Sequence, residues 1–158
     1  MHIFVCLDIT VSLARSIIYQ LYYIVMRRNW IVFANEKLCD HVRAMAEIQC
    51  CNWASYRYNF SVGDIVYMYI CNIEGETRRI RYKTIVEEVH LTDRVDKDYW
   101  HIPLSGDESC LLRLVEEYEG TALDEKEIKK HGFKDFNAGS AKLVKGELLL
   151  YIEDCFSV

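Results

Sequence analysis

Proline and glycine are scarce in this chain, with one proline and seven glycines in 158 residues. Collagen-like segments and long flexible linkers require far more of both residues, so we expect neither. The 51% share of hydrophobic residues is enough for a core without disulfide staples. The length fits one domain of common size.

Basic residues are too few for a protein that binds nucleic acid by charge alone. Lysines and arginines number 19 against 24 aspartates and glutamates, which gives a formal charge of −5. Proteins that depend on charge for nucleic-acid binding are usually basic. Any nucleic-acid contact should therefore be small and local.

The sequence lacks signatures of catalysis and of metal binding. No P-loop, GxSxG, HExxH or GxGxxG motif occurs, and the five histidines are isolated. The seven cysteines form no CxxC pair, so we expect reduced thiols and a cytoplasmic location for the protein. We expect no catalytic residue, no metal and no cofactor.

The first 26 residues are mostly apolar, and only Asp8 and Arg15 among them are charged. Residues 16–26 form an uncharged run that is shorter than the about 20 residues a membrane helix needs. The chain start also lacks the lysine or arginine of a signal peptide. We favour an extra helix packed on the domain, or an extension upstream of a natural start at Met26, over a membrane-associated segment.

The clearest structural signal is the stretch Phe60–Ile70. Val62-Gly63-Asp64 has the composition of a turn, and the uncharged run 65–71 follows it. This run is rich in β-branched and aromatic residues, which predicts a strand buried on both faces. Alternate residues of such a strand face opposite sides of its sheet.

Two further strands and a helix are predicted around this strand. Trp30–Ala34 is a short apolar strand, and Asn35 can cap a helix from 36 to about 50. A hairpin turn at 72–77 leads into a strand at 78–89, whose apolar residues alternate with basic ones.

The C-terminal third adds one strand and two helices. The strand covers 110–118, a capping box at Asp124 and Glu127 opens a short helix, and the last helix covers 144–154. The order of elements indicates an α+β fold, either a small curved sheet or a partial barrel with helices at its edges.

The segment Cys50–Asn59 is predicted as a loop that is unusually rich in aromatic residues, which are Trp53, Tyr56 and Tyr58. These rings either fold back and seal the core or form a stacking wall for a planar ligand such as a nucleobase. In the second case Asn35 and Asn52 can read a base edge, because an amide offers both a donor and an acceptor.

Two segments carry candidate phosphate contacts. The outer face of the 78–89 strand presents Arg79, Arg81 and Lys83, which are either phosphate contacts beside the aromatic pocket or a solvated strand face. In the small-residue loop 137–142, Ser140 and Lys142 can approach a phosphate or base closely. An ordinary connector explains that loop equally well.

The order of Asn52-Trp53, VGDIVYMYI, IRYKTIVEEV and CLLRLVEEY resembles the EVE domain, a PUA-like domain related to the YTH domain. The resemblance covers about residues 30–154 and is greatest to versions found beside modification-dependent restriction endonucleases in bacteria. It implies a PUA-like fold, a strongly bent β-barrel flanked by helices. It also implies a non-enzymatic module that flips a modified base, usually a modified cytosine in DNA rather than RNA, into an aromatic pocket.

Carried over to this chain, the resemblance makes Trp53 the stacking wall, places Asn35 and Asn52 at the pocket mouth, and lets Ser140 close the other side. Family members often carry a nuclease or ATPase domain, for which this chain has no room, so such a partner would be a separate chain. The alternative is a regulatory subunit of a restriction or defence system, whose aromatic loop docks on a protein partner.

Overall fold

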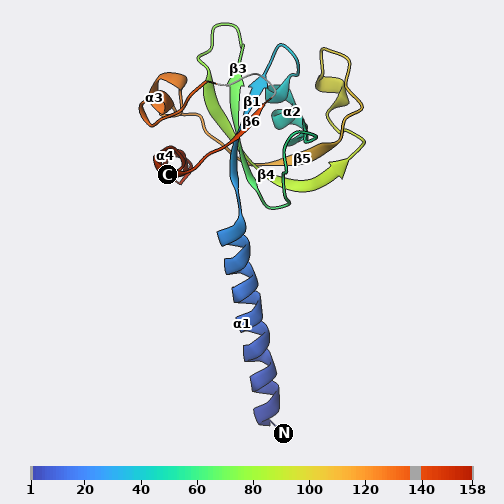
Figure 1. Cartoon of the computed structure of the whole chain (residues 1–158), viewed down its shortest axis with the longest axis vertical. Coiled ribbons are helices and arrows are strands. Elements are labelled where there is room, and N and C mark those ends of the chain that lie inside the picture. The colour runs from blue at the N-terminus through green and yellow to red at the C-terminus, as the bar shows by residue number, and fades with distance from the viewer. Residues whose placement is uncertain (1, 136–139, 158) are drawn as a thin grey trace.

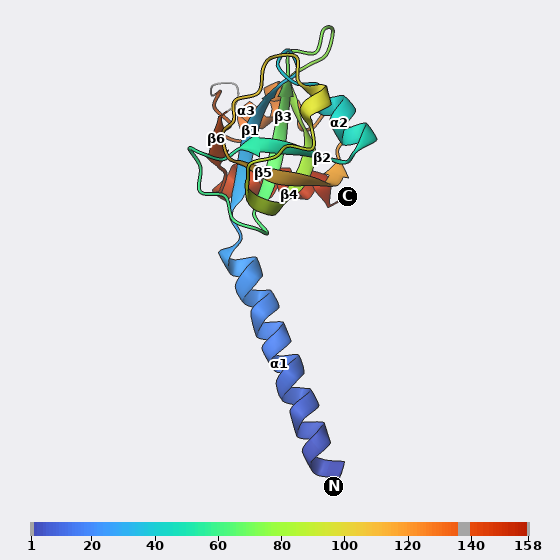
Figure 2. The same cartoon turned by 90° about the vertical axis from the view of Figure 1, so that its right-hand side faces the viewer.

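A long helix leads into a strongly bent, six-stranded sheet in the computed structural model, which describes residues 2–135 and 140–157 (Figures 1 and 2). The strand order is β2-β5-β4-β3-β1-β6. The strands are β1 (Asn29–Asn35), β2 (Cys50–Ala54), β3 (Ile65–Cys71), β4 (Arg79–Leu91), β5 (Ser109–Glu117) and β6 (Ala141–Leu143). The helices in the described residues are α1 (His2–Met26), α2 (His41–Glu47), the 3-10 turn η1 (Lys97–Tyr99), α3 (Glu125–Lys130) and α4 (Gly146–Phe156).

The sheet bends because its two longest strands slip in register. β1 and β3 are parallel, and every other pairing in the sheet is antiparallel. The pairing of β4 with β5 shifts at three places, and each extra residue increases the local twist and bends the strand. The predicted α+β class with a strongly bent sheet is confirmed.

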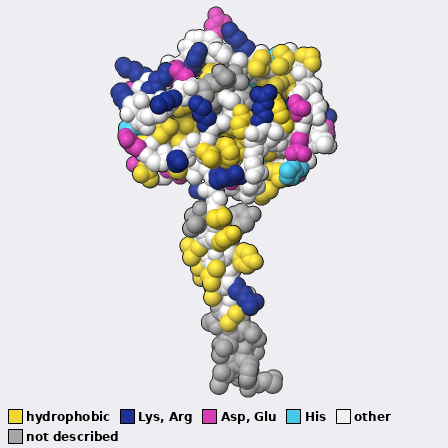
Figure 3. Space-filling view, in the orientation of Figure 1, with side chains coloured by type: hydrophobic (Ala, Val, Ile, Leu, Met, Phe, Trp, Pro, Cys, Tyr) yellow, Lys and Arg dark blue, Asp and Glu magenta, His cyan; other side chains and the backbone are white. Residues whose placement is uncertain are grey.

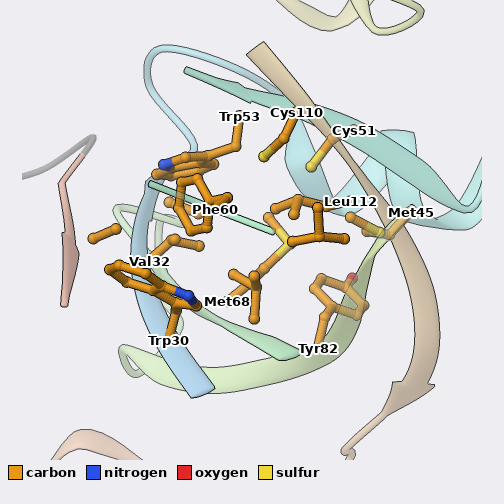
Figure 4. Packing of buried hydrophobic residues seen from close by; sticks show 14 of the residues in the cluster. Trp30, Val32, Met45, Cys51, Trp53, Phe60, Met68, Tyr82, Cys110 and Leu112 are labelled. Carbon is orange, nitrogen blue, oxygen red and sulfur yellow. The ribbon is translucent and has the colours of Figure 1, made fainter. Parts of the chain in front are cut away.

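Strand β3 lies at the centre of the sheet and is buried along its whole length, as its sequence predicts. Val66 and Met68 face an inner cluster that includes Trp30 and Tyr82 (Figure 4). Tyr67 belongs to a second cluster on the opposite face, which α3 and α4 cover. The sheet therefore has a hydrophobic layer on each side.

The Val62–Asp64 turn fixes the start of β3 against β1. Gly63 has a φ of 90°, a conformation that glycine adopts without strain. The buried carboxylate of Asp64 accepts hydrogen bonds from Trp30 Nε1 at 2.9 Å and Arg28 Nη2 at 2.8 Å. These bonds join the turn to the residues at the beginning of β1.

The predicted helix from 36 to about 50 is wrong in its start and its cap. Helix α2 begins at His41, and its N-cap is Asp40, whose side chain accepts from Arg43 N at 3.1 Å. Asn35 is instead the last residue of β1, because Glu36 N donates to Cys71 O and continues the pairing with β3.

Three local details differ from the sequence prediction. The first part of the aromatic segment is not a loop but strand β2, paired antiparallel with β5. Residues 141–143 form the short edge strand β6. Asp124 precedes α3, but its side chain makes no capping bond, so the predicted capping box does not form.

Helix α1 extends away from the sheet (Figures 1 and 2). Ile18 and Tyr19 on it are 64% and 71% exposed, while its last turn, at Tyr22 and Met26, borders a groove against the Val62–Asp64 turn. Within the described residues, no helix is both long and apolar enough to cross a membrane.

Candidate nucleic-acid interface

A small cavity of about 70 Å³ opens where the end of β1, α2, β2 and the β4–β5 connection meet. The pocket is lined by residues of β1, of the turn after it, of α2, of β2 and of the β4–β5 connection. In that order they are Phe33 and Asn35, Leu38, His41, Asn52 to Ala54, and Arg94 and Trp100. We call it the Trp53–Trp100 pocket. Because ligand pockets usually enclose about 300–1,000 Å³, a planar ring requires movement of side chains at its rim.

Trp53 belongs to both the core and the pocket. It is 5% exposed and packs in the inner cluster beside Phe60, yet it also lines the cavity (Figure 4). Its Nε1 is buried and has no hydrogen-bond acceptor among the described residues. A buried N–H without an acceptor is uncommon in native proteins, and here it belongs to a residue that lines the cavity.

Trp100 forms a second aromatic wall, which the sequence analysis missed. Its Nε1 donates to Asp96 Oδ2 at 3.0 Å, and the Arg94 guanidinium lies 4.5 Å from its ring centre. The centre of the His41 ring is 6.3 Å from that of Trp100 and 5.9 Å from that of Trp53. Three flat rings from distant parts of the chain therefore meet at one cavity.

A buried polar network holds the wall that carries Trp100. Asp96 is fully buried, and its carboxylate accepts from Asn52 N at 3.1 Å and from Arg94 Nε at 3.3 Å. Arg94 Nη2 in turn donates to Asn52 O at 2.9 Å. The network ties the β4–β5 connection to β2 and so fixes the distance between Trp53 and Trp100.

Asn52 uses both ends of its side-chain amide inside this network. Its Oδ1 accepts from Val95 N at 2.8 Å, and its Nδ2 donates to Ser109 Oγ at 3.0 Å. Asn52 is also 1% exposed, although it lines the pocket. These bonds give Asn52 a positioning role in the structure.

His41 is held by a carboxylate that also starts α2. Glu36 Oε1 lies 3.0 Å from His41 Nδ1, and the same carboxylate accepts from His41 N and Val42 N at 3.2 and 3.3 Å. The imidazole is 3% exposed. The sequence did not indicate that His41 lines the pocket, because only the fold brings this isolated histidine beside the two tryptophans.

Of the other predicted base-binding residues, Asn35 lines the pocket, and its Oδ1 accepts from Lys37 N and Asn72 Nδ2 at 3.0 and 2.8 Å. Ser140 O accepts from N of the pocket residue Phe33 at 3.1 Å, so Ser140 lies beside the pocket wall. Tyr56 is 55% exposed and is not among the pocket-lining residues. Residues 137–139 of the small-residue loop lie outside the described residues.

The basic face of β4 does not border the pocket. Arg81 pairs with Glu117 at 2.9 Å and Lys83 with Glu153 at 3.1 Å. Arg79 Nη1 donates to Gly120 O at 3.5 Å. The phosphate role of these three residues stays a prediction, but none of them lines the aromatic pocket. Arg79 and Arg81 line a hollow at the 72–78 hairpin, and Lys83 lies against α4. Lys142 lies on β6 and lines a different groove.

The cysteines nearest Trp53 are poor nucleophiles. Cys110 pairs with Trp53 across β2 and β5, and burial raises the pKa of its thiol to about 12. Burial also raises the pKa of Cys51 well above its usual value. Thiolate is the reactive form, so both groups are inert near neutral pH. No cluster of metal-binding side chains occurs in residues 2–135 and 140–157.

No protein-family model matches the chain, and no curated protein matches its sequence. Solved structures do match its fold. A hypothetical protein from Leishmania major is 16% identical with a TM-score of 0.56, over 83% of this chain and 95% of that one. A protein from Pseudomonas putida is 14% identical with a TM-score of 0.56, over 80% and 98% of the two chains.

Human THYN1, crystallised in complex with DNA that contains 5-methylcytosine, matches with a TM-score of 0.55. The identity is 11%, over 83% of this chain and 98% of THYN1. Likeness at such identities concerns the fold alone. It confirms that the curled sheet and its flanking helices form an α+β, PUA-like fold.

Proposed function

We propose that this chain is a non-enzymatic reader of the EVE type, which binds nucleic acid carrying a modified base, with modified cytosine in DNA as the first ligand to test. The observation that carries the proposal is the Trp53–Trp100 pocket, two tryptophans and a histidine around one cavity. The shared fold of THYN1, a protein crystallised with 5-methylcytosine DNA, adds support.

In this proposal the base leaves its stack and enters between Trp53 and Trp100. Stacking on an aromatic side chain contributes about 1–3 kcal/mol per base. The unpaired Nε1 of Trp53 donates to an acceptor on the base, which relieves a buried donor that has no acceptor in the described residues. The cavity of about 70 Å³ opens by movement at its rim, where Leu38 and Trp100 lie.

The other proposed contacts with the nucleotide are assigned by where each residue lies relative to the pocket. We propose that Asn35, which lines the pocket, and Ser140, whose carbonyl bonds to Phe33 N, contact the nucleotide at the pocket mouth, while Asn52 holds the Trp100 wall. Tyr56, exposed outside the pocket, is proposed as an outer contact with the neighbouring nucleotide.

Fluorescence anisotropy tests the proposal with labelled DNA and RNA oligonucleotides, single- and double-stranded, each with cytosine or 5-methylcytosine at one position. Wild type should prefer a modified strand. Trp100→Ala should weaken that binding about ten- to a hundredfold, the equivalent of about 1–3 kcal/mol, whereas Trp100→Phe should keep most of it. Equal binding of every oligonucleotide by wild type and Trp100→Ala would refute the pocket as a base site.

The alternative is a regulatory subunit that binds a nuclease or ATPase made as a separate chain, in a cytoplasmic bacterial restriction or defence system. The exposed apolar side chains of α1, such as Ile18 and Tyr19, favour a protein partner, because large exposed apolar surfaces mark interaction sites. We further propose that residues 30–154 form the reader domain and residues 1–26 an extension. Size-exclusion chromatography of the full chain and of residues 27–158 with neighbouring gene products should show co-elution that depends on α1.

A further inference from the structure

A groove of about 330 Å³ is formed by residues of β1 and β6, the segment after α3 and the start of α4. Three lysines line it, Lys134, Lys142 and Lys145, together with apolar residues that include Ile31 and Leu148. We call it the lysine groove. Lysine and arginine side chains gather on the face of the molecule over α3 and β6 (Figures 1 and 3).

Two of the three groove lysines, Lys134 and Lys145, keep an uncompensated charge within the described residues. Lys134 and Lys145 form no ion pair with any residue of 2–135 or 140–157. The acidic residue in the lining, Glu147, is bonded to His131 Nδ1 at 3.1 Å. A locally positive groove is notable in a chain whose formal charge is −5. By contrast, Arg81 and Lys83 on β4 are both paired with glutamates.

The lysine groove and the Trp53–Trp100 pocket adjoin along β1. Ile31 lines the groove and Phe33, two residues further on, lines the pocket. Two residues of a strand span about 7 Å. Lys142 is the β6 partner of Ile31, and the next link across this edge is the bond from Phe33 N to Ser140 O. One strand edge therefore joins the two sites.

We propose that the lysine groove holds the sugar-phosphate backbone of the strand whose base enters the Trp53–Trp100 pocket, an inference that rests on the proposed function. Lysine ammonium groups are strongly hydrated point charges that contact phosphate without reading sequence. A flipped base leaves its flanking phosphates at the pocket mouth, within reach of this edge. The groove supplies affinity, and the pocket supplies discrimination between modified and unmodified bases.

The test measures binding of matched oligonucleotides with and without 5-methylcytosine across a series of salt concentrations. The double variant Lys134→Gln/Lys145→Gln should weaken binding equally for both oligonucleotides. It should also lower the slope of log affinity against log salt by about 2, roughly one for each lost phosphate contact. The ratio between modified and unmodified strands should not change. The matched control Arg78→Gln/Lys126→Gln removes two exposed cations outside the groove and should leave both quantities at wild-type values.

The outcomes separate this inference from the proposed function. Unchanged affinity and salt slope in the groove variant, with base discrimination intact in wild type, would overturn the groove and leave the pocket. An equal loss in the control variant would overturn it as well, because only net charge would then matter. Binding of inorganic phosphate by wild type and not by the groove variant, without any effect on oligonucleotide affinity, would assign the groove to free phosphate. Absence of discrimination in wild type and in Trp100→Ala would remove the proposed function itself.

Discussion

The charged groups at the Trp53–Trp100 pocket are buried, whereas those on the outer face of β4 lie at the surface. At the pocket, Asp96 and Arg94 are buried and bond to each other and to Asn52, so that the surrounding rings stay in place. On β4, Arg81 is a surface cation whose charge Glu117 on the neighbouring strand cancels. A row of basic residues on a strand indicates a binding surface only when the adjacent elements lack acids, because cross-strand partners otherwise neutralise it.

The largest expected effect is the loss of the buried charge at the pocket. Asp96→Ala leaves Arg94 buried without its acid, and removal of one partner from a buried pair costs about 3–5 kcal/mol. Urea unfolding should show this loss as a lower midpoint. Asp98→Ala, an exposed change two residues away, should alter the free energy of unfolding by less than about 0.5 kcal/mol. Equal losses in the free energy of unfolding for the two variants would contradict the expectation that the buried acid contributes more to stability than the exposed one.

The wall residues should change binding more than folding. Trp100 is half-buried, so Trp100→Ala should reduce affinity about ten- to a hundredfold by loss of stacking. Trp53→Ala is expected to unfold a large part of the population, because truncation of a buried tryptophan costs about 3–5 kcal/mol. Trp53→Phe is therefore the informative change in the anisotropy assay, and circular dichroism should confirm that it is folded.

Buried thiols beside Trp53 predict a loss of stability in alkali. The folded pKa of Cys110 is raised to about 12, whereas an unfolded thiol titrates near 8.5. Above that value the unfolded chain binds fewer protons than the folded chain, so stability falls as pH rises. Between pH 8 and 9.5 this single group should cost about 1 kcal/mol. Urea unfolding of wild type and Cys110→Ala at the two pH values should differ by that amount, and identical pH dependence would contradict the burial argument.

The smallest effect is expected on β4. Arg81 pairs with Glu117 and Glu76 at a partly exposed site, where such pairs contribute about 0–1 kcal/mol. Arg81→Gln should therefore change stability by less than about 1 kcal/mol. Oligonucleotide affinity should fall clearly only if Arg81 leaves its glutamates to contact phosphate, and a reduced salt slope in this variant would restore the β4 face as part of the interface.

Much of the fold was predictable from local pattern. The apolar run 65–71 and the alternation along β4 give strands of the predicted type, because a strand buried on both faces is apolar throughout, whereas one buried on a single face alternates with a period of two. The start of α2 was not predictable, since Asn35 has capping chemistry but is held in β1 by pairing with β3. The loop after residue 54 begins later than predicted, because β2 finds its partner in β5 only through a contact distant in sequence.

The sequence alone determined the central strand, the mixed α+β composition, the −5 charge and the prominence of Trp53. The tertiary structure decided which residues share a site with Trp53. His41, Arg94 and Trp100 reach it from separate elements, and no local pattern marks them. It also decided which cations are neutralised, because ion pairing depends on the acids that neighbouring strands and helices bring within reach. Residue type is a property of the chain, whereas proximity and burial arise only when the sheet closes.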